Sequence, residues 1–304
     1  MRAARAALAT AALALLAVAG CSPQSEDRPH VVVTTNILGD VTRNVLGDEA
    51  DVTVLMKPNA DPHSFGVSAR RAAEIENADL VVFNGLGLEE NVLRHVEAAR
   101  EAGVVTLGVG EKVDPIDYTS DASEGQPDPH FWTDPDRMGT AVDLLAESVV
   151  KNVDGIDGSQ VRQNARAYRK DVAGLSSWME GKFGRIPSER KRLVTNHHVF
   201  GYLAQRFGFT VVGAVIPSGT TLASPSAADL DSLATAVEKA GVSAIFADSS
   251  QPDRLAQVLK KESDVDVDVV PLFSESLTGR GGGAPTYLQM MRANTRALTD
   301  GLTG

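Results

Sequence analysis

The chain has 304 residues, 43% of them hydrophobic, which is long enough for a large buried core and for more than one lobe. Its formal net charge is −11 at pH 7, and it becomes −13 without residues 1–20, which carry two arginines and no acidic residue. So acidic a chain is unsuited to nucleic acid, whose phosphates it would repel. Its single cysteine, Cys21, excludes both a disulfide framework and a cysteine-rich metal site.

Residues 1–20 are typical of a bacterial lipoprotein signal peptide. A short basic start precedes the apolar run ALATAALALLAVA, which is short for a membrane span, and no stop-transfer pattern follows. The sequence VAGC that ends at Cys21 resembles a lipobox, which implies cleavage before this cysteine and its lipidation; the alternative is a free cysteine. Residues 21–29 then form a polar tether. We expect a lipid-anchored protein at the extracytoplasmic face of the cell membrane.

Short apolar runs alternate with helical patterns through the rest of the chain. The predicted strands are 30–36, 51–56, 79–85, 104–108, 192–198, 209–217, 242–248 and 267–273. The predicted helices lie near 68–77, 89–102, 226–240, 251–262 and 285–300, with one more starting after Asp134-Pro135. This alternation indicates mainly parallel sheets covered by helices on both faces. The fold class is therefore α/β, with about four strands in an N-terminal lobe (30–155) and about four in a C-terminal lobe (187–304).

Residues 156–186 predict one long helix between the two lobes. Ser159 is a plausible N-cap, and Pro187 lies beyond the C-terminal end. About 26 helical residues span roughly 39 Å, more than an ordinary crossover needs. We expect this helix to join the lobes, and the alternative is a helix folded onto one of them. Its apolar face is predicted from residues at steps of four and three: Val161, Ala165, Tyr168, Val172, Leu175 and Met179.

Histidines and a carboxylate follow several of the predicted strands. Two copies of the tripeptide Asp-Pro-His, at 61–63 and 128–130, place His63 and His130 on segments whose backbone is restricted by proline. His197 follows the strand that starts at 192, and Glu275 follows the last strand. Because ligands bind beyond the carboxyl ends of parallel strands, we expect these side chains to meet between the lobes. Such nitrogen and oxygen donors suit Zn²⁺.

Four more residues are candidates for contact with the metal or its ligands. Asp248 ends a strand and is a substitute for the fourth ligand or a neighbour of the site, and His198 adjoins His197. Asp61 and Asp128 are candidates to accept hydrogen bonds from the imidazoles that follow them. The alternative is that these two aspartates only shape their turns.

Six stretches, spread over nearly the whole chain after the signal peptide, form a recognisable set: VVVTTNILGDVTRNVLGD, DPHSFGVSAR, NADLVVFNGLGLE, DPHFWTDP, TNHHVFGYLAQRFG and APTYLQMMRANTRAL. Together they resemble the zinc/manganese solute-binding lipoproteins of ABC importers. The resemblance implies two α/β lobes joined by a long helix, with one metal ion held between them. It also implies delivery of the ion to a membrane permease with its ATPase, without catalytic turnover.

Carried over residue by residue, the resemblance implies the metal ligands His63, His130, His197 and Glu275. The fourth ligand of the family is usually an aspartate, which this chain replaces with glutamate. The loop 111–128 has no histidine, whereas zinc-specific members often carry a histidine-rich loop there. Manganese-type members commonly have a carboxylate at the position of His197, and a third imidazole favours Zn²⁺ over Mn²⁺.

We therefore predict a monomeric binding protein, not an enzyme, that captures Zn²⁺ for import. Binding of Mn²⁺ or Fe²⁺ in the same type of importer is the alternative. An alternative from another class is a surface-anchored zinc hydrolase, which would need a general base such as Glu275 or Asp248 beside an open metal position. No HExxH motif supports that alternative. With two ligands from each lobe, metal binding would be coupled to small closing movements.

Overall fold

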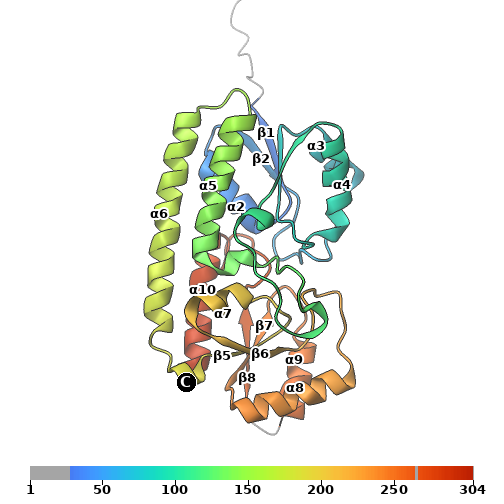
Figure 1. Cartoon of the computed structure of the whole chain (residues 1–304), viewed down its shortest axis with the longest axis vertical. Helices are drawn as coiled ribbons and strands as arrows, with labels where there is room; N and C mark the ends of the chain where they lie inside the picture. Colours follow the sequence, from blue (N-terminus) through green and yellow to red (C-terminus); the bar gives the residue numbers. More distant parts are fainter. Residues whose placement is uncertain (1–27, 264–265, 304) are drawn as a thin grey trace, which may run out of the picture.

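The computed structural model of the chain describes residues 28–263 and 266–303 (Figure 1). The predicted signal peptide, the lipidation site Cys21 and most of the tether 21–29 lie outside these residues. Within them, none of the helices has the length and apolar character needed to cross a membrane.

Eight parallel strands form two separate four-stranded sheets, one in each lobe (Figure 1). The strand order is β2-β1-β3-β4 in the first sheet and β6-β5-β7-β8 in the second, so the two lobes repeat one topology. The predicted α/β class with two lobes is confirmed. The strands are β1 (His30–Val33), β2 (Asp51–Val54), β3 (Leu80–Phe83), β4 (Val105–Gly108), β5 (Arg192–Thr195), β6 (Thr210–Ala214), β7 (Ala244–Asp248) and β8 (Asp268–Leu272).

Nine α-helices cover and connect the sheets in the part of the chain that the structure describes. Two of them, α2 and α7, were not predicted. The first begins within a run that reads as the end of a strand, and the second is too short for periodicity to identify. The helices are α2 (Asn36–Leu46), α3 (Ala69–Glu76), α4 (Glu90–Glu101), α5 (Pro135–Asn152), α6 (Gly158–Phe183), α7 (Gly201–Phe207), α8 (Ala227–Ala240), α9 (Arg254–Glu262) and α10 (Tyr287–Thr303).

Helix α6 runs along both lobes, as the long helix at the left of Figure 1 shows. It packs against α2 and α5 of the N-terminal lobe and against α10, which lies on the second sheet. All six residues of the predicted apolar face are buried. The largest apolar cluster is therefore continuous from Val31 in β1 to Phe246 in β7. A shared core of this kind resists large rotations of one lobe against the other.

The N-cap of α6 is Asp157, so the prediction of Ser159 as the cap is wrong. The carboxylate of Asp157 accepts hydrogen bonds from the backbone N–H groups of Ser159 and Gln160, at 2.8 and 3.2 Å. Helix α5, in contrast, begins one residue before its predicted start, with Asp134 as the cap and Pro135 at the first helical position. At α6 an aspartate also places a negative charge at the helix N-terminus, which the helix dipole stabilises.

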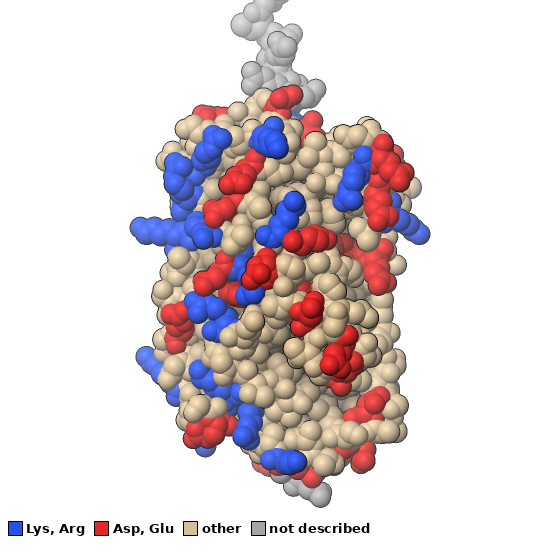
Figure 2. Space-filling view, viewed as in Figure 1, with Lys and Arg blue, Asp and Glu red and all other residues tan. Residues whose placement is uncertain are grey.

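Charged side chains of both signs are interspersed with uncharged residues on the face drawn in Figure 2. Basic side chains are most frequent along the left edge, where α6 lies in the same view. An interspersed pattern is that of a solvated surface and not of a phosphate-binding groove.

Candidate metal centre

Three histidines and one glutamate from four different loops meet between the two sheets. His63 follows β2, His130 lies in the connection from β4 to α5, His197 follows β5, and Glu275 follows β8. All four side chains are buried, and one donor atom from each lies within 4.8 Å of the other three. The structure thus brings together the four residues that the resemblance implies.

The donor atoms of the cluster are spaced like ligands around a single point. From Glu275, the carboxylate oxygens lie 3.1 Å from His197 Nε2, 3.4 Å from His130 Nε2 and 3.7 Å from His63 Nε2. The Nε2 atoms of His63 and His130 are 3.4 Å apart. These are non-bonded separations that leave room for a small ion at the centre.

The two Asp-Pro-His segments use their aspartates differently. In both, the backbone N–H of the histidine donates to the aspartate Oδ1 at 2.9 Å, so both aspartates shape their turns. Asp128 Oδ1 also lies 2.7 Å from His130 Nδ1 and holds the ring, which leaves Nε2 directed at the cluster. The second oxygen of Asp61 instead accepts hydrogen bonds from Thr221 and Gln251. The proposed contact with the imidazole is therefore present at Asp128, and Asp61 faces the other lobe.

Several buried polar atoms of the cluster have no hydrogen-bond partner among the described residues. They are both ring nitrogens of His197 and both carboxylate oxygens of Glu275. An unsatisfied buried polar atom costs about 1–3 kcal/mol. A cation at the centre would give a partner to the His197 ring and to the carboxylate, so the donor set fits a metal ion.

Burial keeps two of the histidines neutral. It lowers the pKa of His63 to about 2 and that of His197 to about 3, with a further contribution from the neighbouring His130. Burial opposes protonation of His130 too, but the carboxylates of Glu275 and Asp128 together raise the pKa of that ring. Neutral imidazoles present free lone pairs, which is the form that binds a metal.

Glu275 has the opposite shift. Burial raises its pKa to about 8, and the nearby carboxylates of Asp248 and Asp61 act in the same direction, although His130 opposes them. Because Glu275 and His130 face each other, we treat them as a pair that holds one proton near neutral pH. A divalent cation would replace that proton.

An acidic segment covers the cluster on one side. In this cover loop (residues 117–126), Tyr118 lies with its hydroxyl 3.2 Å from His130 Nδ1 and donates to the carbonyl of Gly219 at 3.2 Å. Ser123 Oγ accepts from the backbone N–H of Gly219 at 2.9 Å. The loop therefore leaves the N-terminal lobe and is tied down on the C-terminal one.

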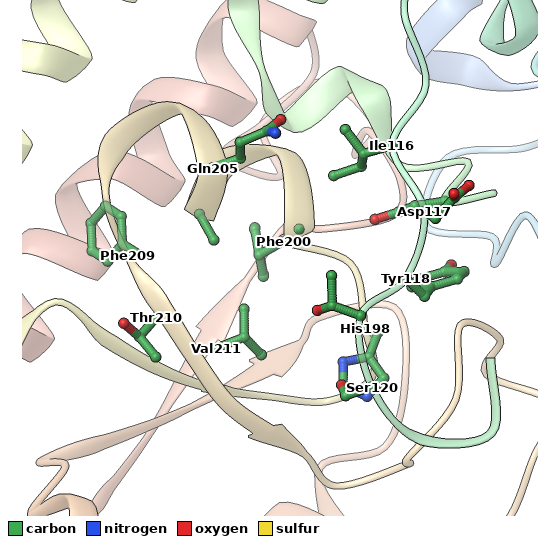
Figure 3. Close-up of a pocket in the computed structure, with 14 residues that line it drawn as sticks. Ile116, Asp117, Tyr118, Ser120, His198, Phe200, Gln205, Phe209, Thr210 and Val211 are labelled. Carbon is green, nitrogen blue, oxygen red and sulfur yellow. The ribbon is translucent and has the colours of Figure 1, made fainter. Parts of the chain in front are cut away.

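A cavity of about 460 Å³ lies on the outer side of the cover loop, between it, α7 and β6 (Figure 3). Tyr118, Asp128 and His198 are part of its lining. None of the four cluster residues, all within the described ranges, lines this cavity. Tyr118 contacts both His130 and the cavity, so its side chain lies between the cluster and the outside.

The other two candidates lie beside the cluster and not in it. His198 Nε2 is 2.6 Å from a carboxylate oxygen of Asp121 in the cover loop. The carboxylate of Asp248 accepts hydrogen bonds from the hydroxyls of Ser250 and Ser274. Among the described residues, the cluster thus has Glu275 as its carboxylate, and Asp248 lies beside it, bonded to Ser274.

Sequence reasoning missed the residues that hold the cluster in place. Trp132 packs edge-on against His130, with ring centroids 5.2 Å apart, and Asn36 bonds to the segment that carries Glu275. Asn36 is the last residue of the first predicted strand, so a search of the strand ends for polar side chains would have found it. No motif pointed to Tyr118.

The family model described as ZnuA, zinc-uptake complex component A, periplasmic, matches residues 31–301. The chain belongs to the ZnuA family. Among relatives, the zinc-binding protein TroA of Treponema pallidum is 29% identical over 282 residues, which are 91% of this chain and 90% of TroA. The manganese-binding lipoprotein MntA of Halalkalibacterium halodurans is 27% identical, with 96% of each chain covered. The iron-binding protein YfeA of Yersinia pestis is 26% identical, with 94% of this chain and 90% of YfeA covered.

The solved structure of periplasmic zinc-binding TroA has the same fold. It superimposes with a TM-score of 0.83 at 27% identity and covers 91% of this chain and 100% of TroA. The resemblance to metal-binding proteins of ABC importers is therefore confirmed. The ZnuA-family relatives are named for three different metals, so membership alone does not choose among zinc, manganese and iron.

Proposed function

We propose that this protein captures Zn²⁺ with His63, His130, His197 and Glu275 and delivers the ion to the permease and ATPase of an ABC importer. The observation that carries the proposal is the convergence of four buried donors, two of which have no other hydrogen-bond partner among the described residues. Relatives named as substrate-binding lipoproteins of metal ABC transporters support the import role. A closed set of four protein ligands suits capture and leaves no open position for a catalytic water.

The chemistry of the donors favours zinc, and their spacing is compatible with a tetrahedral ion. Ligands of a tetrahedral ion bound at about 2.0–2.2 Å lie about 3.3–3.6 Å from one another. The donor separations that involve Glu275 range from 3.1 to 3.7 Å. Three imidazoles and one carboxylate also suit Zn²⁺ better than Mn²⁺, which prefers oxygen-rich sites.

We further propose that the mature chain is a monomer held at the outer face of the cytoplasmic membrane by lipid on Cys21. The VAGC sequence and the relatives named as lipoproteins support this proposal. The tether would then lead directly into β1, which begins at His30.

Equilibrium dialysis with metal analysis tests the capture function. We expect one Zn²⁺ per chain and displacement of bound Mn²⁺ by an equal concentration of Zn²⁺. Retention of Mn²⁺ or Fe²⁺ against zinc would assign the protein to another metal. Zinc-dependent hydrolysis of ester or peptide substrates by the loaded protein would contradict a pure binding role.

Replacement of Asp128 by alanine is expected to weaken Zn²⁺ binding by about 10- to 100-fold. The change removes the acceptor of His130 Nδ1 and leaves all four proposed ligands in place. Replacement by asparagine, which retains an acceptor oxygen, should have a smaller effect. The measurement is competition against a chromogenic chelator. Affinities of both variants equal to that of the parent would show that the contact does not support metal binding.

A further inference from the structure

The segment that carries Glu275 belongs to the C-terminal half of the chain but is hydrogen-bonded to the N-terminal lobe. Asn36, at the start of α2, donates its side-chain N–H to Ser276 Oγ at 2.7 Å. Its Oδ1 accepts from the backbone N–H of Leu277 at 2.9 Å. One buried asparagine thus holds the two residues that follow Glu275.

Two more contacts fix the same segment to the N-terminal lobe. The backbone N–H of Asn59 donates to the carbonyl of Leu277 at 2.9 Å. The indole Nε1 of Trp132 donates to the carbonyl of Ser274 at 2.9 Å. On the other side, the hydroxyl of Ser274 bonds to Asp248 at the end of β7. The balance of contacts therefore places Glu275 with His63 and His130.

The backbone of His197, in contrast, is held in place by the C-terminal lobe. The hydroxyl of Thr195 donates to the carbonyl of His197 at 2.8 Å and fixes the turn after β5. The carbonyl of the intervening Asn196 accepts from the backbone N–H of Ile216 at 2.8 Å. Three of the four cluster side chains, those of His63, His130 and Glu275, are therefore held mainly by the N-terminal lobe, and His197 is held by the C-terminal lobe. In the sequence, by contrast, two of the four lie in each half of the chain.

Asp61 spans the boundary between these two groups. Its Oδ1 shapes the turn that carries His63, whereas its Oδ2 accepts hydrogen bonds from Thr221 Oγ1 at 2.6 Å and from Gln251 Nε2 at 2.9 Å. Thr221 follows β6 and Gln251 follows β7, so both donors come from the C-terminal lobe. The Asp61 side chain is buried, and hydrogen bonds to a charged acceptor are about twice as strong as neutral ones.

We propose that Asp61 is a positioning residue for metal release, because its hydrogen bonds to Thr221 and Gln251 hold His197 against a unit formed by His63, His130 and Glu275. This inference rests on the proposed function. When the two hydrogen bonds break, the C-terminal lobe withdraws His197 and the ion keeps three ligands. A three-coordinate ion is open to an incoming ligand, such as a side chain of a permease. The cover loop is bonded to the C-terminal lobe through Tyr118, Ser123 and the contact of Asp121 with His198, so it moves with that lobe in this step.

The test is the rate at which zinc-loaded protein releases its metal to an excess of chelator, followed by stopped flow. The double variant Thr221→Val, Gln251→Leu removes both donors and leaves Asp61 and every proposed ligand unchanged. We expect faster release, by about tenfold for each hydrogen bond lost, and a much smaller change in the association rate. Asp61→Asn is expected to act in the same direction. The asparagine Oδ1 still accepts from the His63 N–H, whereas its Nδ2, in the place of the second carboxylate oxygen, cannot accept hydrogen bonds from Thr221 and Gln251.

A matched control is the double variant Thr210→Val, Gln257→Leu. It makes the same chemical changes at an exposed position of β6 and on α9, where Gln257 bonds to Asp253 and not to Asp61. Release from this control at the parent rate is expected. If the Thr221, Gln251 variant also releases zinc at the parent rate, Asp61 does not control release. If the parent protein binds no zinc at all, the proposed function itself is wrong, which is a different outcome from an unchanged release rate in the variant.

Hydrogen exchange of the metal-free protein tests the three-to-one division separately. In the Thr221, Gln251 variant we expect faster amide exchange in residues 218–222 and 249–253, with the Leu277 amide as protected as in the parent. Equal acceleration in 274–278 would show that the Glu275 segment moves with the C-terminal lobe, which would overturn the division.

Discussion

Replacing His197 by alanine is expected to weaken Zn²⁺ binding by about 100-fold or more, the largest effect that we predict for any single side chain. A four-ligand zinc site is worth about 10–16 kcal/mol, so one ligand contributes roughly 3 kcal/mol, or about two factors of ten. His197 is fully buried and its ring has no hydrogen-bond partner among the described residues, so the change removes no hydrogen bond of the ring. Competition against a chelator of known affinity measures the loss.

The matched control is His95→Ala. His95 is a half-buried histidine on α4, far from the cluster in the fold, and its ring is 3.5 Å from the side chain of Arg94. We expect this variant to bind Zn²⁺ like the parent. The loss of one ligand should change the affinity by far more than a factor of about three. If the affinity of the His197 variant stays within that factor of the parent value, His197 is not a ligand.

The sequence predicted the positions of the four cluster residues because that information is local. Each of them lies beyond a short apolar run, and in parallel sheets the carboxyl ends of such runs gather at one edge. The Asp-Pro step before His63 and before His130 was informative for the same reason, since it fixes a turn within three residues. The long helix was predictable for the same reason, because its apolar residues recur at the helical period within one continuous stretch of sequence.

The contacts that hold the cluster could not be predicted in this way. Asn36 and Ser276 are 240 residues apart, and a single polar side chain has no periodicity that would mark its partner. The cap of α6 shows the same limit on a smaller scale, because Ser159 and Asp157 are both good caps and only the backbone geometry selects the aspartate.

The two Asp-Pro-His segments illustrate what tertiary structure adds to a repeated motif. Both aspartates form the same turn, yet Asp128 orients an imidazole and Asp61 reaches two residues of the other lobe. The difference arises from what lies opposite each turn. A repeated tripeptide therefore determines where its histidine lies but does not determine the hydrogen-bond partners of its carboxylate.

The metal-free protein is expected to lose stability as the pH rises from 6.5 to 8. Burial raises the pKa of Glu275 from 4.5 to about 8, so between these values the folded protein holds a proton that the unfolded chain has released. The free energy of unfolding then falls with rising pH by about 1.4 kcal/mol per unit, or about 2 kcal/mol over this range. Denaturant unfolding in the presence of a chelator measures the change.

Below pH 6.5 the histidines reverse the slope. The pKa of His63 is lowered to about 2 and that of His197 to about 3, so between pH 3 and 6.5 the unfolded chain binds protons that the folded protein excludes. The free energy of unfolding therefore rises with pH in this range, and the two histidines together outweigh the single glutamate. The contribution of these three residues to the stability of the metal-free protein is therefore largest near pH 6.5.

The variant Glu275→Gln tests whether the pH dependence of stability arises from this cluster or from other groups in the molecule. Glutamine fills nearly the same volume but does not titrate, and it removes the negative charge that helps to raise the pKa of His130. We expect the fall in stability between pH 6.5 and 8 to be smaller in the variant by the share of Glu275, and an undiminished fall would assign it to groups elsewhere. Part of the fall should persist, because burial also raises the pKa of Glu89 and the carboxylate of Asp128 helps to raise that of His130. Saturation of the parent protein with Zn²⁺ should also reduce the fall, because a carboxylate bound to a cation has already lost its proton. A smaller slope on adding metal, and a smaller slope in the variant, would together show that the proton and the ion compete for Glu275.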